Sequence, residues 1–155
     1  MFDSISSAGM SMRRKPLAAC LAAMFCLTAP AAAVAATTWT VNTCDETNVG
    51  SGTTGTLRYA AANAVSGDTI DLSTLACSTI SLTTGGGGVV LLAQSDITLK
   101  GPGKDALSID GNHQSRVLRH TGNGTLSVNN LTVSHGYFQA SSGQSAYGGC
   151  ILSNG

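Results

Sequence analysis

The sequence predicts an all-β fold, a parallel β-helix in which short strands stack coil upon coil. Three observations support this prediction. Apolar residues repeatedly occur as pairs separated by one polar residue, which is the period-two pattern of a strand. Gly-rich or Asn-rich turns separate the pairs, and each strand is very short. The spacing of an apolar helix face occurs once, ahead of all but the first predicted strand.

Residues 1–36 are predicted to be a secretory signal peptide. Basic residues at 13–15 precede an apolar run at 17–27, and small residues follow, so cleavage is expected after Ala35 or Ala36. The apolar run is shorter than the ~20 residues of a membrane-spanning helix, so no retained membrane span is expected.

Two weaker alternatives overlap this segment. Residues 17–20 resemble a lipoprotein box and residues 13–14 a twin-arginine signal, but the neighbouring residues depart from both patterns. An exported protein is therefore expected, extracellular or at the cell surface in association with the outer membrane, with the periplasm as the alternative.

Composition excludes some classes of partner. The chain has 155 residues, of which 10% are charged, and Lys plus Arg equals Asp plus Glu at 8 each. Residues 37–155 carry five basic residues against seven acidic ones. Because no positive excess attracts a polyanion, no nucleic-acid partner is expected.

Residues 37–155 are predicted to form the N-terminal cap and first coils of the β-helix. Trp39 and Val41 share one face of a first strand over residues 38–41, which is expected to cover a sheet edge. A turn-rich stretch follows at residues 42–55.

The next segment, residues 56–65, is predicted to be a helix that covers the open N-terminal end of the coils. Either Thr54 or Thr56 is the expected N-cap, and Gly67 with Asp68 ends the helix. The apolar face consists of Leu57, Ala60, Ala61, Ala64 and Val65.

The remaining chain is predicted to consist of strands of three to five residues. Their apolar pairs are Ile70/Leu72, Ile80/Leu82, Ile97/Leu99, Leu107/Ile109, Leu126/Val128 and Leu131/Val133. The turns between them include residues 85–88, 101–103, 110–112, 122–124, 129–130 and 135–136. A small antiparallel sandwich is the alternative architecture. The short strands and repeated Leu-Thr-Ile-like units favour stacked coils.

Three cysteines follow the signal segment. A disulfide between Cys44 and Cys77 is predicted, because both flank the same helical segment and export implies an oxidising compartment. Such a bond is expected to add about 3–4 kcal/mol of stability. Cys150 then has no partner. A metal site would need a CxxC pair, so neither a metal nor a cofactor is expected.

Six segments together resemble bacterial secreted or surface proteins with a right-handed, pectin-lyase-like β-helix. They are Gly55–Arg58, Ser66–Ile70, Ile97–Gly103, Leu107–Asn112, Leu131–Gly136 and Gly148–Ile151. Members of this group often carry a Cys-Ser-Leu-Arg-Glu-Ala cap motif. Residues 55–60 match it at Leu57, Arg58 and Ala60 but lack the Cys and the Glu. The resemblance implies that the chain stops in mid-coil at Gly155 and is truncated at its C-terminus.

Arg116, Arg119 and His120 form the densest polar cluster and are the candidate ligand-binding residues. Two patterns of alternation are compatible with this segment, one with Val117 facing inward and one with Leu118 facing inward. An exposed arginine pair is able to bind an acidic sugar, although a solvated strand face explains the same residues.

No catalytic residue is predicted. Asp68 with Asp71 and Asp105 with Asp110 are the carboxylate pairs that hydrolysis would need, but an aspartate beside a turn glycine is explained by its local hydrogen bonds. His135-Gly136 resembles a polygalacturonase motif, but the partner carboxylate motifs are missing.

The expected function is therefore that of an exported, non-enzymatic segment for adhesion, glycan contact or display, with extracellular glycans as partners. The alternative is the N-terminal part of a polysaccharide lyase or glycoside hydrolase whose active face lies on later coils. A structural spacer is the third hypothesis.

Overall fold

The computed structural model describes residues 35–83, 88–143, 145 and 148–154. The predicted signal segment therefore lies outside the described residues, apart from positions 35 and 36, as do residues 85–87 of one predicted turn. In the described part of the chain, no helix combines the length and apolar character needed to cross a bilayer.

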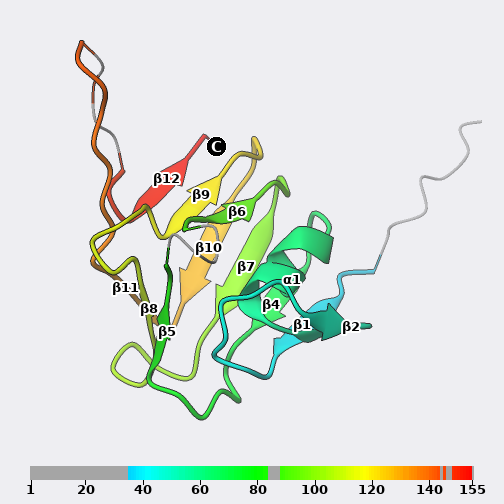
Figure 1. Cartoon of the computed structure of the whole chain (residues 1–155). Helices are drawn as coiled ribbons and strands as arrows, with labels where there is room; N and C mark the ends of the chain where they lie inside the picture. The colour runs from blue at the N-terminus through cyan, green and yellow to red at the C-terminus, as the bar shows by residue number, and fades with distance from the viewer. Residues whose placement is uncertain (1–34, 84–87, 144, 146–147, 155) are drawn as a thin grey trace, which may run out of the picture. The chain divides into compact units, whose positions relative to one another are not determined.

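The described residues form a β-solenoid of about four turns, with strands stacked in three parallel sheets (Figure 1). This confirms the predicted all-β parallel β-helix and excludes the antiparallel sandwich. The strands are β1 (Thr38–Val41), β2 (Gly50–Ser51), β3 (Thr54–Gly55), β4 (Thr69–Asp71), β5 (Thr79–Ser81), β6 (Val90–Leu92), β7 (Ile97–Lys100), β8 (Ser108–Asp110), β9 (Leu118–His120), β10 (Leu126–Asn129), β11 (Thr132–Ser134) and β12 (Ile151–Ser153).

Each complete coil contributes one strand to each sheet. The first sheet has the order β10-β7-β4-β1-β3-β2, the second β11-β8-β5 and the third β12-β9-β6. All of these pairings are parallel except that of β2 with β3, which form a small antiparallel hairpin. Coil 1 is thus β4, β5 and β6, coil 2 is β7, β8 and β9, and coil 3 is β10, β11 and β12.

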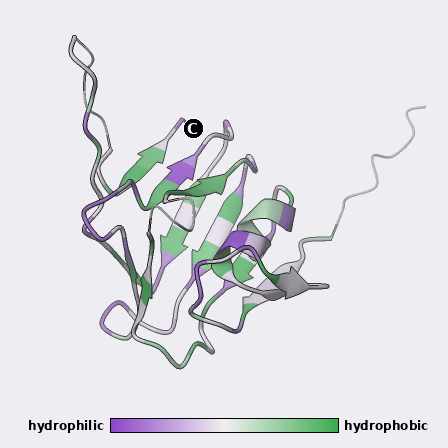
Figure 2. Cartoon of the chain, viewed as in Figure 1, coloured by the Kyte–Doolittle hydropathy of each residue, from purple (hydrophilic) through white to green (hydrophobic). Residues whose placement is uncertain are grey.

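The core lies between the three sheets and is built from the predicted apolar pairs. Ile70 pairs in register with Leu99, and Ile80 with Ile109, and all four side chains are fully buried. Equivalent positions thus stack apolar on apolar along the coil axis, as the hydropathy colouring of the strands shows (Figure 2). In coil 3 the inward residues Leu126, Val128 and Val133 are only half-buried.

The sequence pattern did not predict the third sheet. Strand β6 is apolar throughout, β12 begins with two consecutive apolar residues, and β9 places a histidine inward, so none has an apolar pair separated by one polar residue. Val117 and Leu118 are both fully buried, which corrects both patterns of alternation expected for that segment. The chain turns a corner just before β9, and consecutive side chains point inward there.

The predicted helix forms as α1, Leu57–Asn63, and is shorter than expected at both ends. Thr56 is the N-cap, and its Oγ1 accepts the Tyr59 N–H at 3.1 Å. Because the helix ends before Val65, that side chain leaves the predicted apolar face and is exposed.

The N-terminal segments cover strand edges that begin the stack. Helix α1 packs beside β6, the first strand of the third sheet. Beside the second sheet, Glu46 accepts hydrogen bonds from Thr83, two residues after β5, one of them from the backbone N–H at 2.7 Å and one from the hydroxyl group. Glu46 also pairs with Arg58 of α1 at 3.3 Å. A covered strand edge is not available to pair with a strand of another molecule.

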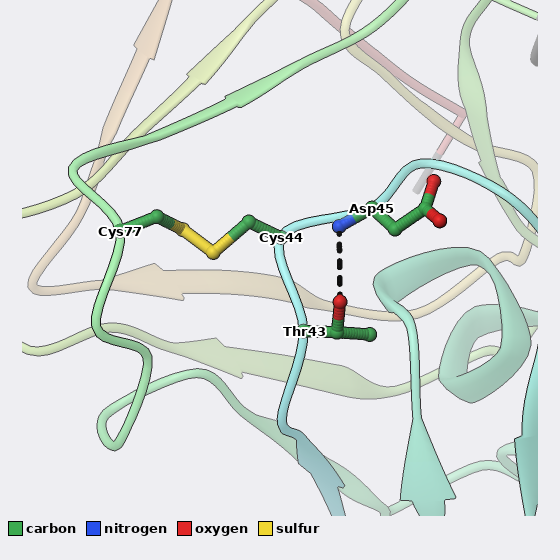
Figure 3. The surroundings of a disulfide bond; sticks show 4 residues. All are labelled: Thr43, Cys44, Asp45 and Cys77. Carbon is green, nitrogen blue, oxygen red and sulfur yellow. Dashed lines mark hydrogen bonds between the residues drawn. A yellow bond between two sulfur atoms is a disulfide. The ribbon is translucent and has the colours of Figure 1, made fainter.

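The predicted disulfide between Cys44 and Cys77 is present, with the two Cα atoms 6.3 Å apart (Figure 3). It joins the segment after β1 to the connection between β4 and β5. The adjacent chain is held by a local turn in which the Asp45 N–H donates to Thr43 Oγ1 at 3.4 Å. Cys150 is a free, half-buried cysteine, and the Gly136 N–H donates to its Sγ at 3.3 Å.

Candidate functional site

An open groove of about 370 Å³ combines arginines with aromatic side chains. It lies where coil 2 and coil 3 turn from the second sheet to the third. Its described lining is Val89, Gln114, Ser115, Arg116, Arg119, Tyr137, Phe138 and Gln139. Two of the three predicted ligand-binding residues, Arg116 and Arg119, are therefore neighbours in one groove.

The groove forms because two connections of unequal length run side by side. Residues 111–117 link β8 to β9, and residues 135–150 link β11 to β12. Backbone hydrogen bonds join the two connections, from the His113 N–H to the His135 oxygen at 2.9 Å and from the Tyr137 N–H to the Ser115 oxygen at 2.8 Å. The longer connection thus brings two exposed aromatic side chains beside the arginines.

Arg116 is held in place by contacts on both sides of its guanidinium group. Its Nε donates to the Gly148 oxygen at 2.9 Å. Its Cζ lies 3.4 Å from the centroid of the Phe138 ring, a cation–π contact. This arginine therefore connects the two ends of the long connection and fixes the position of the Phe138 ring.

Arg119 projects from the centre of β9 and is exposed. Its neighbours in register are Leu91 on β6 and Leu152 on β12. The outward positions of the first and second sheets instead carry hydroxyl, amide and charged side chains, such as Thr69, Thr98 and Ser108. The third sheet thus has an amphipathic outer face, unlike the other two.

His120 lies on the opposite face of β9 and is fully buried. Its Nε2 lies 2.7 Å from the Gln94 oxygen and 3.1 Å from the Ser95 oxygen, so this nitrogen carries the hydrogen. Its Nδ1 lies 2.8 Å from Ser153 Oγ on β12. The structure thus does not bring His120 to the surface that Arg116 and Arg119 share. The histidine joins neighbouring coils.

We expect His120→Leu to lower the free energy of unfolding by about 1–3 kcal/mol, because it leaves buried carbonyl oxygens without their donor. Urea denaturation of the purified chain measures this loss. Ser81→Ala, at an exposed position of β5, is the control and should change stability by no more than about 0.5 kcal/mol. Equal losses in the two variants would show that the buried hydrogen bonds do not stabilise the coil.

A second, more apolar depression of about 440 Å³ lies between α1 and β6 and shares Val89 with the groove. Arg58 and Gln94 line it, but both side chains donate hydrogen bonds to backbone oxygens of the fold. Arg58 donates to the Val89 oxygen at 3.1 Å and also to the Gly88 oxygen. The Gln94 amide donates to the Ala61 and Ala64 oxygens at 2.9 and 2.8 Å, at the end of α1.

The carboxylates that were considered for catalysis have structural partners. Asp68 is buried and accepts three N–H donors, and Asp71 accepts the Ser73 N–H at 2.8 Å. A hydrogen bond from the Ser73 side chain lowers the pKa of Asp71 more than burial raises it, and the backbone N–H bond and the charge of Lys100 lower this pKa further. Asp105 is exposed and pairs with Lys104 at 2.6 Å. Neither predicted pair supplies a carboxylate to the lining of the groove.

Asp110 belongs to a histidine cluster at the end of the second sheet. His135 Nδ1 lies 2.8 Å from Asp110 Oδ2, and the His113 ring packs against the His135 ring with centroids 4.6 Å apart and the ring planes tilted by 43°. Burial raises the pKa of Asp110. Hydrogen bonds from His135 and Asn112, together with the charges of the nearby histidines, lower this pKa by more than burial raises it, so the net shift is downward. Among the residues described, no three His, Cys, Asp or Glu side chains are grouped to hold a metal ion.

Comparison of the chain with protein-family models, with curated proteins and with solved structures gives no significant match. The groove is therefore interpreted from its own residues. Its arginines were accessible to sequence reasoning because they stand close together in a polar segment. Tyr137 and Phe138 were missed, since no periodicity in the sequence indicates that their connection lies beside residues 114–116.

Proposed function

We propose that this chain is an exported, non-enzymatic β-helix segment that contacts glycans through the groove. The observation that carries the proposal is that two exposed aromatic side chains, Tyr137 and Phe138, line the same groove as two arginines. Aromatic faces provide apolar contact for sugar rings, and guanidinium groups provide directed hydrogen bonds. Small-molecule sites have this mixture of apolar walls and few polar groups.

The proposal includes the finer type of the fold. A right-handed, pectin-lyase-like β-helix with a cap similar to the Cys-Ser-Leu-Arg-Glu-Ala type is supported by the matching residues Leu57, Arg58 and Ala60. Their positions on α1, beside β6, suit a capping role. Export to the cell surface or the medium is supported by the basic, apolar and small order of residues 13–36.

The non-enzymatic role is supported by the chemistry of the groove. Glycoside hydrolysis usually requires two carboxyl groups that flank the scissile bond. The described lining of the groove contains no Asp or Glu. The alternative, the N-terminal part of a lyase or hydrolase with its active face on later coils, places cleavage elsewhere than in this groove.

We expect Tyr137→Ala to weaken glycan binding roughly tenfold, because the exposed ring supplies apolar contact to the sugar and lies at the groove. Isothermal titration of the exported chain with cellotetraose measures this effect, and Tyr137→Phe is the matched control that keeps the ring. A reducing-sugar assay on the same samples is expected to show no new ends. Equal affinities in Tyr137→Ala and the parent chain, or steady release of reducing ends, would contradict the proposal.

A further inference from the structure

The groove is cationic within a chain that is otherwise mildly acidic. Two arginines line it, and its described lining holds no acidic residue. Residues 37–155 as a whole carry five Lys and Arg against seven Asp and Glu. The positive charge is therefore local to the groove, and it complements a negatively charged ligand.

The two arginines differ in what already occupies their guanidinium groups. Arg116 donates to the Gly148 oxygen and lies over the Phe138 ring, so it holds two parts of the groove wall together. Within the described residues, the Arg119 guanidinium has no hydrogen bond or ion pair and is exposed. Arg119 is thus the group with unused donors, which a ligand can satisfy.

The backbone of Arg119 is also fixed in position by the scaffold. It stands at the centre of β9, which is hydrogen-bonded to β6 on one side and β12 on the other. Leu91 and Leu152 lie beside it in register, where strands are ~4.8 Å apart, and their apolar side chains flank its aliphatic stem. A charge on a central strand is held more rigidly than a charge on a loop.

We propose that the groove binds an acidic glycan, with a sugar carboxylate paired to Arg119 and the sugar ring against Tyr137 and Phe138. The inference rests on the proposed function, since it names the class of glycan that the same groove takes. A carboxylate matches the planar fork of a guanidinium group with two parallel hydrogen bonds. A volume of about 370 Å³, open to solvent, suits a short stretch of a longer sugar chain.

The test compares two tetrasaccharides that differ only at carbon 6, β-1,4-linked tetraglucuronate and cellotetraose, by isothermal titration of the exported chain. We expect the glucuronate to bind at least tenfold more tightly at low salt. We expect Arg119→Gln to remove this advantage, so that the two tetrasaccharides bind with equal affinity. Because exposed ion pairs are screened, the advantage should also shrink between 50 mM and 500 mM NaCl.

Two further variants separate the role of Arg119 from general effects of charge. Lys104→Gln removes the same charge at an exposed site outside the groove and should leave both affinities unchanged. Arg119→Lys keeps the charge without the bidentate fork and should retain only part of the preference for glucuronate. The melting temperature of each variant confirms that it is folded.

The outcomes distinguish this inference from the proposed function. Equal binding of both tetrasaccharides would leave glycan contact standing and overturn the acidic class. Loss of the glucuronate preference in Lys104→Gln to the same extent as in Arg119→Gln would also overturn the assignment to Arg119. Equally tight binding of a sulfated cellotetraose would overturn the choice of a carboxylate. Absence of binding to every one of these probes would overturn both proposals.

Discussion

Replacing both Cys44 and Cys77 with serine is expected to lower the free energy of unfolding by about 3–4 kcal/mol. The disulfide closes a loop across a sequence separation of 33 residues, and removing it restores that conformational freedom to the unfolded chain. The same loop contains α1 and ends close to the edge strand β5. Losing the bond therefore also loosens the segments that cover the beginning of the stack.

Urea denaturation of the oxidised chain and of the double variant measures the difference. Both cysteines are replaced together, so that neither is left to pair with Cys150. Cys150→Ser is the matched control and should cost no more than about 1 kcal/mol, since it removes one weak Gly136 N–H to sulfur contact. A double variant as stable as this control would show that the covering segments are held by the rest of the fold.

Replacing Asp68 with alanine is expected to cost about 3–5 kcal/mol. Its Oδ1 accepts the Thr37 N–H at 2.7 Å, and its Oδ2 accepts Trp39 Nε1 and the Val65 N–H, each at 2.8 Å. One buried carboxylate thus joins β1 to the end of the helical segment. Each donor left unsatisfied costs roughly 1–3 kcal/mol. Asp105→Asn, at an exposed position, is the matched control and should change stability by about 0.5 kcal/mol at most.

The contribution of Asp68 is expected to depend on pH. Burial raises the pKa of Asp68, but the hydrogen bonds from Val65, Thr37 and Trp39 together outweigh it and hold the pKa below its ordinary value. The pKa of Glu46 is lowered in the same way, because bonds from Thr83 and Arg58 outweigh its burial. The folded state therefore binds fewer protons than the unfolded state, and this stability is present above the unfolded pKa of ~4 and is lost as the pH falls through the folded pKa.

Melting temperatures of the parent chain and of Asp68→Asn between pH 7 and pH 2 test this sign. The parent should lose stability steeply below about pH 4, and the difference between the two chains should narrow there. A difference that widens on acidification would show that Asp68 does not act as a hydrogen-bonded carboxylate. The asparagine is close in size, so the comparison isolates the charge and the hydrogen bonds.

The sequence predicted the parts of this fold in which one local rule determines the outcome. Apolar pairs at period two identified inward residues such as Ile70 and Ile109, and Thr56 followed from the preference for hydroxyl side chains at an N-cap. The disulfide partner of Cys77 could be predicted because only two other cysteines follow the signal segment. In each case the information lies within a few residues or in the cysteine count.

The rest depends on contacts between coils, which no local pattern records. The strand β9 was hidden because it buries His120, a residue whose polar groups are satisfied by Gln94 and Ser153 from neighbouring coils. The sequence predicted only the arginines of the groove, and Arg119 was expected to face outward in only one of the two patterns of alternation. Tyr137 lies at the groove because backbone hydrogen bonds join the two connections, including the bond from its own N–H to the Ser115 oxygen.

The corner between the second and third sheets carries the groove that we propose as a glycan site, and it varies without changing the stack of strands. It lengthens from residues 111–117 in coil 2 to residues 135–150 in coil 3, yet β12 keeps its register with β9, with Ile151 opposite Leu118. The length of this corner can therefore change during evolution while the strands keep their register. The same corner is a suitable place to insert an engineered binding loop.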